Sequence, residues 1–339
     1  MNSGPQQTTS APPALRLGTR RSKLAMAQSG GVADRVRQLT GRAVELVEVT
    51  TFGDVSRAHL TQIGGTGVFV SALRDALLRG EIDFAVHSLK DLPTTQPAEC
   101  ALAAVPTRVD PRDALIARDG LTFEGLAVAG GAGGGVARIG TGSPRRMAQL
   151  SAWARAIGCE IETVPIRGNV ETRIGYVRKG ELDGVVLAAA GLRRIGRDAE
   201  VTAFLPTEAV LPAPGQGALA IECASSNAPL AAQLAELDDP STRAVVTAER
   251  SLLAALEAGC SAPVGALADL HDDGEAATEM RLRGAVGTTD GSTLVQLSTT
   301  GSLPASVEEI LARAERMGRE LAEEMLAKGA AGLMGERVL

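Results

Sequence analysis

The chain has 339 residues, of which 45% are hydrophobic and 22% are charged, and this is enough for two or three domains with their own cores. Aromatic residues make up only 2% of the chain, so these cores must be largely aliphatic. A net charge of −6 argues against a nucleic-acid-binding protein, which would carry an excess of basic residues, and no apolar run is long enough to cross a membrane.

Residues 1–13 are polar and lack the apolar core of an export signal. We therefore expect a disordered tail and a cytoplasmic protein. Short apolar segments then alternate with helical patterns, as in open α/β sheets. Strands are expected at Leu15–Leu17, Val44–Thr50, Ile82–Val86, Leu102–Val105, Ala114–Ala117, Arg138–Gly140, Ile161–Pro165, Gly184–Ala188 and Leu219–Cys223. Helices are expected over about Ser22–Leu39, Gly67–Arg79, Ser143–Ala156, Asn169–Arg178 and Ser241–Glu257.

The last hundred or so residues follow a different pattern, typical of a small α+β domain. Alternating segments at Met280–Val286 and Thr293–Thr299 precede one long helical pattern over about Ser306–Lys328. Earlier in the chain, Gly130–Gly135 is almost entirely Gly and Ala. We interpret it as a flexible surface insertion; a phosphate loop is the weaker alternative, because the lysine and hydroxyl residue of such loops are missing.

Basic residues gather where predicted strands end. The strand that starts at Ile82 continues into His87, Ser88, Lys90 and Asp91. Ligands of α/β sheets bind beyond the carboxyl ends of strands, so these polar groups are candidates for a site, although a solvated turn closed by a proline is equally compatible with them.

The segment Gly140–Arg146 places a glycine turn before a helix that opens with two arginines. Cations oppose the dipole at a helix N-terminus, whereas anions bind there, so Arg145 and Arg146 indicate an anion site. Similar basic segments are Thr19–Ser22, Arg167–Arg173 and Gly191–Arg194. Each could be a solvated charge, but five basic clusters at strand-to-helix turns predict a polyanionic ligand.

The cysteines Cys100, Cys159, Cys223 and Cys260 are far apart in the chain and form no CxxC pair. This spacing argues against a zinc site or a disulfide framework and fits a reducing compartment. Cys260 differs from the others because it follows a helix within a Gly- and Pro-containing loop, where a modified thiol is plausible. We expect no bound metal.

Ten short motifs, in this order, together resemble porphobilinogen deaminases (hydroxymethylbilane synthases). They are TRRS at 19–22, GDV at 53–55, GGTGVF at 64–69, VHSLKDLP at 86–93, DPRDA at 110–114, GTGSPRR at 140–146, RGNVETR at 167–173, AGLRR at 190–194, PGQGA at 214–218 and GCSAP at 259–263. The resemblance extends from about Leu15 to the C-terminal helix.

The resemblance implies two α/β domains like those of periplasmic binding proteins, around a cleft, plus a smaller α+β C-terminal domain. Domain 1 would comprise residues 14–107 with 218–235, domain 2 residues 108–217, and domain 3 residues 240–339. The implied cofactor is dipyrromethane, two linked pyrroles covalently attached to the sulfur of Cys260, and the third domain would carry its loop. A monomer that contacts neither nucleic acid nor membrane is expected.

The implied reaction joins four porphobilinogens head to tail and yields hydroxymethylbilane, in tetrapyrrole biosynthesis. Loss of ammonia from each substrate leaves an electrophilic azafulvene, which the free α-carbon of the growing chain attacks. By residue-by-residue match, Asp91 would be the catalytic carboxylate. Cofactor contacts would come from Lys90, Ser143, Arg145, Arg146 and Arg194. Substrate contacts would come from Arg20, Ser22, Arg167 and Arg173, with Phe69 and Gln216 as weaker candidates.

The sequence departs from the family pattern at several positions. Gln62 and Thr66 stand where lysine is often found, Phe52 where a basic residue is common, and Lys23 where proline is common. These differences leave cation contacts from this loop open.

Two other interpretations remain. An anion-binding solute receptor would suit two lobes around a basic cleft, but an export signal is missing and a third domain is present. A cysteine hydrolase needs a base beside its thiol, and of the histidines His59, His87 and His271 none forms a recognisable triad.

Overall fold

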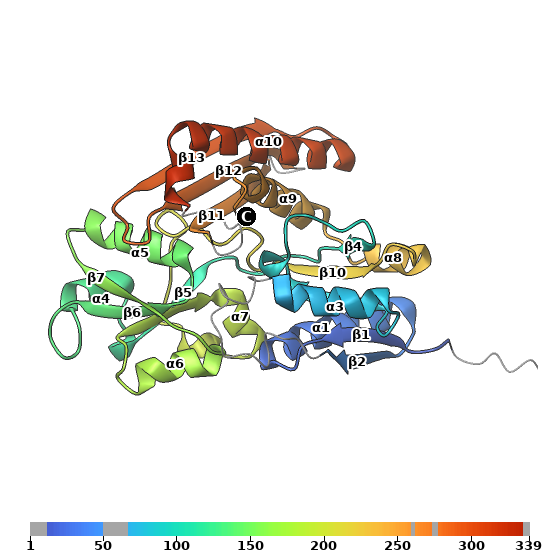
Figure 1. The fold of residues 1–339 in the computed structure, drawn as a ribbon, viewed down its shortest axis with the longest axis horizontal. Coiled ribbons are helices and arrows are strands. Elements are labelled where there is room, and N and C mark those ends of the chain that lie inside the picture. Colours follow the sequence, from blue (N-terminus) through green and yellow to red (C-terminus); the bar gives the residue numbers. More distant parts are fainter. Residues whose placement is uncertain (1–11, 50–66, 259–261, 273–276, 335–339) are drawn as a thin grey trace, which may run out of the picture.

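Three sheets organise the chain (Figure 1). The computed structural model describes residues 12–49, 67–258, 262–272 and 277–334. Two of the sheets have five strands and mixed direction, and the third has three antiparallel strands. Among the described residues no helix is both long and apolar enough to cross a membrane.

The first sheet has the strand order β2-β1-β3-β10-β4. Its strands are β1 (Leu15–Thr19), β2 (Val44–Glu48), β3 (Phe84–Ser88), β4 (Cys100–Ala104) and β10 (Leu219–Ala224). Its helices are α1 (Lys23–Thr40), α3 (Gly67–Leu78) and α8 (Ala228–Ala235). Leu17 and Phe84 are fully buried beneath these helices, and the aliphatic core that surrounds them fits the low aromatic content.

The second sheet repeats this arrangement with the order β7-β6-β8-β5-β9. Its strands are β5 (Asp113–Ala117), β6 (Ala137–Thr141), β7 (Ile161–Pro165), β8 (Gly184–Ala188) and β9 (Ala203–Phe204). Its helices are α4 (Phe123–Ala129), α5 (Pro144–Ala156), α6 (Val170–Arg178) and α7 (Ala189–Arg194). Phe123 stacks on Trp153 in its core, with ring centroids 4.1 Å apart.

One strand of each α/β sheet, β10 in the first and β5 in the second, runs antiparallel to its neighbours. Each of these strands directly follows a segment in which the chain passes from one sheet to the other. The chain crosses to the second sheet between β4 and β5, and it returns before β10. The two crossing segments touch, because Val109 N donates to Gly217 O at 3.4 Å. A Cβ on Gly217 would lie 2.5 Å from the carbonyl oxygen of Val109, and its φ of +90° also favours glycine.

The third sheet consists of β11 (Val264–Asp272), β12 (Ala277–Gly287) and β13 (Leu294–Ser302). Two helices pack against it, α9 (Pro240–Ala255) and α10 (Val307–Ala327). Figure 1 shows this part, in orange and red, above the junction of the two α/β sheets. The sequence-based fold class, two α/β units plus a smaller α+β unit, is confirmed.

Glu249 on α9 joins all three parts. Its carboxylate, 0% exposed, accepts two hydrogen bonds from Arg108 of the first crossing segment, at 2.7 and 3.1 Å. It also accepts from the backbone N–H of Gly215 in the returning segment and of Ala268 in β11. Removing one partner of such a buried pair costs about 3–5 kcal/mol, so this cluster fixes how the crossing segments meet the third sheet.

Each strand and helix expected from the sequence is present in the described residues, with ends shifted by a few residues. The expectations omitted α4, α7, α8, β9 and β11. Residues 130–135 form an exposed turn between α4 and β6. There the Asp183 carboxylate accepts a hydrogen bond from Ala132 N at 2.8 Å, which places negative charge where a phosphate loop would offer donors.

Candidate active site

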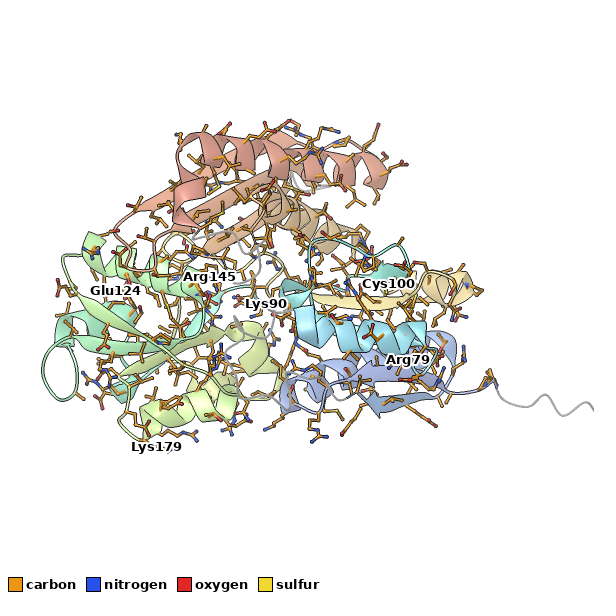
Figure 2. All side chains as sticks on the ribbon, viewed as in Figure 1. Arg79, Lys90, Cys100, Glu124, Arg145 and Lys179 are labelled. Atoms are coloured by element: carbon orange, nitrogen blue, oxygen red, sulfur yellow. The ribbon has the colours of Figure 1, made fainter. Side chains whose placement is uncertain are left out.

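Four of the five basic clusters directly follow a strand, as the sequence predicts, whereas Arg193 and Arg194 lie in the last turn of a helix, α7. Lys90 follows β3 in a short 3-10 turn, Arg20 lies between β1 and α1, and Arg145 opens α5 after β6. Arg167 lies between β7 and α6, and Arg194 closes α7 after β8. Figure 2 shows Lys90 and Arg145 near the junction of the two sheets, whereas Arg79 and Lys179 lie toward the outside.

A cavity of about 240 Å³ lies between the two α/β sheets. Four of its lining side chains are sequence-predicted site residues: Lys90, Asp91 and Arg194, and the weaker candidate Gln216. The other lining residues come from α1, the ends of β3 and β8, α7 and the returning segment: Leu24, Gln28, Ser88, Ala188, Ala190, Gly191, Gly217 and Ala218. The structure therefore brings together the polar ends of strands that belong to different sheets.

Lys90 is a partly buried cation in this cavity. Loss of hydration lowers the pKa of its ammonium from 10.5 to about 8; Asp91 acts in the opposite direction, and Arg146 adds to the lowering. Its Nζ donates to the side-chain oxygen of Gln216 at 3.4 Å. A ligand carboxylate at this position would relieve the unfavourable burial of the positive charge.

Asp91 is exposed and closes the same 3-10 turn, Leu89–Asp91. Leu89 and Leu92, which flank the two polar residues, are almost fully buried, so the turn is anchored by apolar side chains on one side and presents Lys90 and Asp91 on the other. Within the described ranges the Asp91 carboxylate has no hydrogen-bond or ion-pair partner. It is thus available to a ligand.

Gln216 links Lys90 to the second sheet. Its amide nitrogen donates to Asp113 Oδ1 at 2.8 Å and to the carbonyl of Pro111 at 2.7 Å. The glycines on either side, Gly215 and Gly217, have φ of +76° and +90°, a conformation that favours glycine. The PGQGA segment therefore folds as a tight turn that delivers one buried amide, and Gln216 gains support as a site residue.

Arg145 and Arg146 share one counterion, Asp113. Asp113 Oδ2 lies 2.8 Å from Arg145 Nη1, and its Oδ1 lies 2.7 Å from Arg146 Nη2. Burial by itself raises the pKa of Asp113, but the two guanidinium groups more than offset this and hold the pKa below its ordinary value. Burial also lowers the pKa of Arg145, and Arg146 adds to this effect.

These three buried groups carry one net positive charge, because two cations face one anion. All three are at most 5% exposed, and the Nε atoms of both arginines are buried without a hydrogen-bond partner in the described part of the chain. Buried polar groups are normally satisfied, and an excess buried charge calls for a further anion. The cluster thus suits an anionic ligand beside α5.

The N-terminus of α5 offers further donors. Ser143 occupies the N-cap position and Pro144 the first turn, as expected, but the Ser143 side chain makes no capping hydrogen bond. Its hydroxyl and the first amides of the helix remain suited to an anion.

Arg167 and Arg173 lie at the neighbouring turn. Asn169 caps α6 through a 2.8 Å bond from Thr172 N, which places Arg173 in the first helical turn. Burial lowers the pKa of Arg173, with Arg146 and Arg167 adding to the shift. Arg167 is exposed. Arg146 lowers the pKa of both Lys90 and Arg173, so the charges of these three clusters influence one another.

Arg194 and the first basic segment complete the set. Arg194 Nη2 donates to Gly217 O at 2.7 Å, and burial lowers its pKa to about 10. Ser22 caps α1 by accepting from Ala25 N at 3.3 Å, so its hydroxyl also has a structural role. Arg20 lies two residues before Ser22. Leu24, the second residue of α1, lines the cavity.

Cys260, Phe52, Gln62 and Thr66 lie outside the described residues, as does the side chain of Phe69. The other cysteines differ in environment. Cys100 and Cys223 are buried, and burial raises the pKa of both thiols, with Glu222 adding to each shift. Cys159 is partly exposed and lines a different pocket, with Glu160 and Asp290.

Sequence reasoning missed Asp113, Arg108 and Glu249 as parts of the site's framework. Asp113 belongs to the DPRDA motif. Its position as an acidic residue at the start of an apolar strand could have indicated a buried counterion. Arg108 and Glu249 are 141 residues apart, and no local pattern links them. In the described part of the chain, no group of three or more His, Cys, Asp or Glu side chains is arranged to hold a metal ion.

Two family models match the chain. The model described as porphobilinogen deaminase, dipyromethane cofactor binding domain, matches residues 15–232. The model described as porphobilinogen deaminase, C-terminal domain, matches residues 244–327.

Similar proteins come from several bacteria. A solved periplasmic binding protein of Salmonella typhimurium is a distant structural match, with 12% identity and a TM-score of 0.36 over 67% of this chain and 92% of that chain. Porphobilinogen deaminase 1 of Streptomyces avermitilis is 77% identical over 96% of this chain and 98% of its own length. Porphobilinogen deaminase of Thermobifida fusca is 54% identical over 93% of this chain and 94% of its own length. The chain therefore belongs to the porphobilinogen deaminase family.

Proposed function

We propose that this protein is a hydroxymethylbilane synthase, which joins four porphobilinogens head to tail with release of ammonia. The observation that carries the proposal is the cavity lined by two cations, Lys90 and Arg194, and one carboxylate, Asp91. Each substrate unit carries an acetate and a propionate, which cations can bind, and condensation needs one acidic group at the reacting ring. We propose that it acts as a cytoplasmic monomer in tetrapyrrole biosynthesis.

The donor set suits a dipyrromethane cofactor attached to Cys260. Its two pyrroles carry four carboxylates, and the candidate partners are Lys90, Arg145, Arg146, Arg194 and the Ser143 hydroxyl. The excess positive charge around Asp113 and the unpartnered Nε atoms support this fit. When bound, the group supplies the carbon nucleophile to which the first substrate is joined.

Asp91 is proposed to move protons and to stabilise positive charge at the pyrrole nitrogen. A carboxylate that is exposed to the cavity and has no hydrogen-bond partner among the described residues can accept a hydrogen bond from a ring N–H. Lys90 and Arg194 would hold the substituent carboxylates and so orient the rings. Arg20, Ser22, Arg167 and Arg173 would receive the incoming substrate.

The test is the intact mass of the purified protein before and after brief exposure to porphobilinogen. We expect the resting protein to exceed its sequence mass by two linked pyrrole units. After exposure, further species should appear, spaced by one deaminated substrate unit. A chain of unmodified mass that takes up no units would instead favour a solute-binding protein and contradict the proposal.

A second expected result concerns the charge of Lys90. In a cofactor-free Cys260→Ser variant its pKa should lie near 8, so the ammonium is charged below that pH and neutral above it. Binding of carboxylates stabilises the charged form and should raise the pKa. By linkage, polyanion binding should weaken as the pH rises through about 8.

Lys90 can be observed directly because the chain has only the lysines Lys23, Lys90, Lys179 and Lys328. Reductive methylation with ¹³C would give few NMR signals, and Lys90→Arg would assign the one of interest. Lys179, which is exposed, serves as the reference. Equal titration of the two lysines in the cofactor-free protein, or no upward shift in the loaded protein, would contradict this role.

A further inference from the structure

Arg250 on α9 reaches the turn that carries Lys90 and Asp91. Its Nη1 donates to the carbonyl oxygens of Leu92 at 2.8 Å and Leu89 at 3.3 Å, and its Nη2 donates to that of Pro93 at 2.7 Å. One guanidinium from the third part of the chain thus binds three carbonyls, one at the start of the turn and two just after its end. Leu89 O also accepts from Leu92 N within the turn at 3.1 Å, and Arg250 adds donors from outside the turn to the carbonyls of Leu92 and Pro93.

The apolar side of the same turn rests on α9 as well. Leu89 and Leu92 belong to a cluster of buried residues that includes Val246 and Leu253 of α9. Glu249, the residue before Arg250 on α9, accepts a hydrogen bond from Gly215 N at 2.7 Å. Gly215 directly precedes Gln216, the hydrogen-bond partner of Lys90. Two adjacent residues of α9 therefore hold the two segments that present Lys90.

The same helix leads to the proposed attachment residue. α9 ends at Ala255, five residues before Cys260. A shift of the catalytic turn relative to α9 would consequently be a shift of Asp91 relative to the point where the growing chain is anchored. In Figure 1, α9 lies between the third sheet and the junction of the two α/β sheets.

We infer that Arg250 is a positioning residue for this reaction, which fixes the Lys90–Asp91 turn relative to the helix that leads to the cofactor loop. The inference rests on the proposed function. On this account Arg250 contacts neither substrate nor cofactor, and it positions the turn through its hydrogen bonds to the carbonyls of Leu89, Leu92 and Pro93. A small displacement of catalytic groups can lower a rate by about 100-fold.

The test compares Arg250→Gln with Arg243→Gln. Arg243 is a matched control, because it lies two turns earlier on α9 and also donates to carbonyls of the first sheet, those of Leu102 and Ala103 at 3.4 Å, besides pairing with Asp238. We expect Arg250→Gln to keep the covalent adduct and to lower kcat by about 10- to 100-fold, with KM changed less than about threefold. Arg243→Gln should lower thermal stability and leave kcat unchanged.

A second readout follows Lys90, whose pKa reflects burial together with Asp91, Asp113, Arg145 and Arg146. A loosened turn should hydrate the ammonium, so Arg250→Gln should raise its pKa from about 8 toward 10.5 in the cofactor-free background. Arg250→Lys should retain some of the hydrogen bonds to the turn. Its kcat should therefore lie about 3- to 10-fold below that of wild type, a smaller loss than in Arg250→Gln.

A kcat of Arg250→Gln equal to that of wild type, or a Lys90 pKa that does not move, would overturn the inference. If the Gln variant does not fold, Arg250→Lys decides the question, and wild-type kcat in that variant would overturn it. The wild-type protein is assayed in parallel. If it forms no product, the proposed function fails, and the Lys90 titration still tests the positioning by Arg250.

Discussion

Replacement of Asp91 by alanine is expected to lower turnover by at least about 10³-fold, because a general acid or base contributes ~10²–10⁴ and electrostatic stabilisation adds to it. This corresponds to about 4 kcal/mol in the activation free energy. The fold should persist, since Asp91 is exposed and the turn is anchored by Leu89 and Leu92. Stability should change by less than about 0.5 kcal/mol, as is usual at such positions.

Steady-state rates measured at pH 6 to 7 would check this expectation. Asp91 helps to keep Lys90 protonated, so at higher pH the variant would also lose charge on Lys90 and the two effects would mix. Asp34→Ala is the control, because it removes an aspartate whose side chain is 68% exposed on α1, the helix that also lines the cavity. A rate within tenfold of wild type in Asp91→Ala would rule out the catalytic role.

Cys260→Ser is expected to abolish both the adduct and the activity. The serine hydroxyl is far less ionised near neutral pH than the cysteine thiol, and the thiolate is the better nucleophile. The cofactor should therefore not become attached to the variant. Intact mass should equal the sequence mass of the variant, and no product should be detectable. Cys260 lies outside the described residues; it is chosen for its loop context and the GCSAP motif, and the environments of the other three thiols support this choice.

Cys100 and Cys223 are buried, and their raised pKa disfavours the thiolate. Cys159 follows the far end of α5, whose last residue, Ala156, lies about 16 Å along the helix from Arg145 by the 1.5 Å rise per helical residue. Single Ser substitutions at these three positions should therefore keep the adduct. Recovery of the pyrroles on a peptide that lacks residue 260 would disprove the assignment.

The sequence was the better guide where the signal was local. Ser143-Pro144 and Asn169 mark helix starts, and the basic residues after apolar strands mark the site, because capping and strand-end polarity act over a few residues. β11 was missed because Val264–Ala268 are all buried, which removes the alternation of a half-exposed strand. α8 was missed although Asn227 and Pro229 give it a local start signal.

The framework of the site depends on long-range pairing that no local pattern encodes. Asp113 acquires its role only because β5 lies beside β8, which brings it under α5. Arg250 acquires its role because α9 packs against a turn 157 to 161 residues earlier in the chain. Such partners follow from sheet order and domain contact, so the sequence indicated the candidate ligand contacts but not the groups that hold them.

The late return of β10 has a consequence for synthesis on the ribosome. All strands of the second sheet lie within residues 113–204. In the first sheet, β3 and β4 pair with β10, which is synthesised only at Leu219–Ala224. At ~5–20 residues per second, the nascent N-terminal segment spends on the order of ten seconds with two strand edges unpaired, and unpaired edges favour aggregation. The second sheet can therefore close first, and the demand for chaperones should fall on the N-terminal part, which emerges earliest and is completed later.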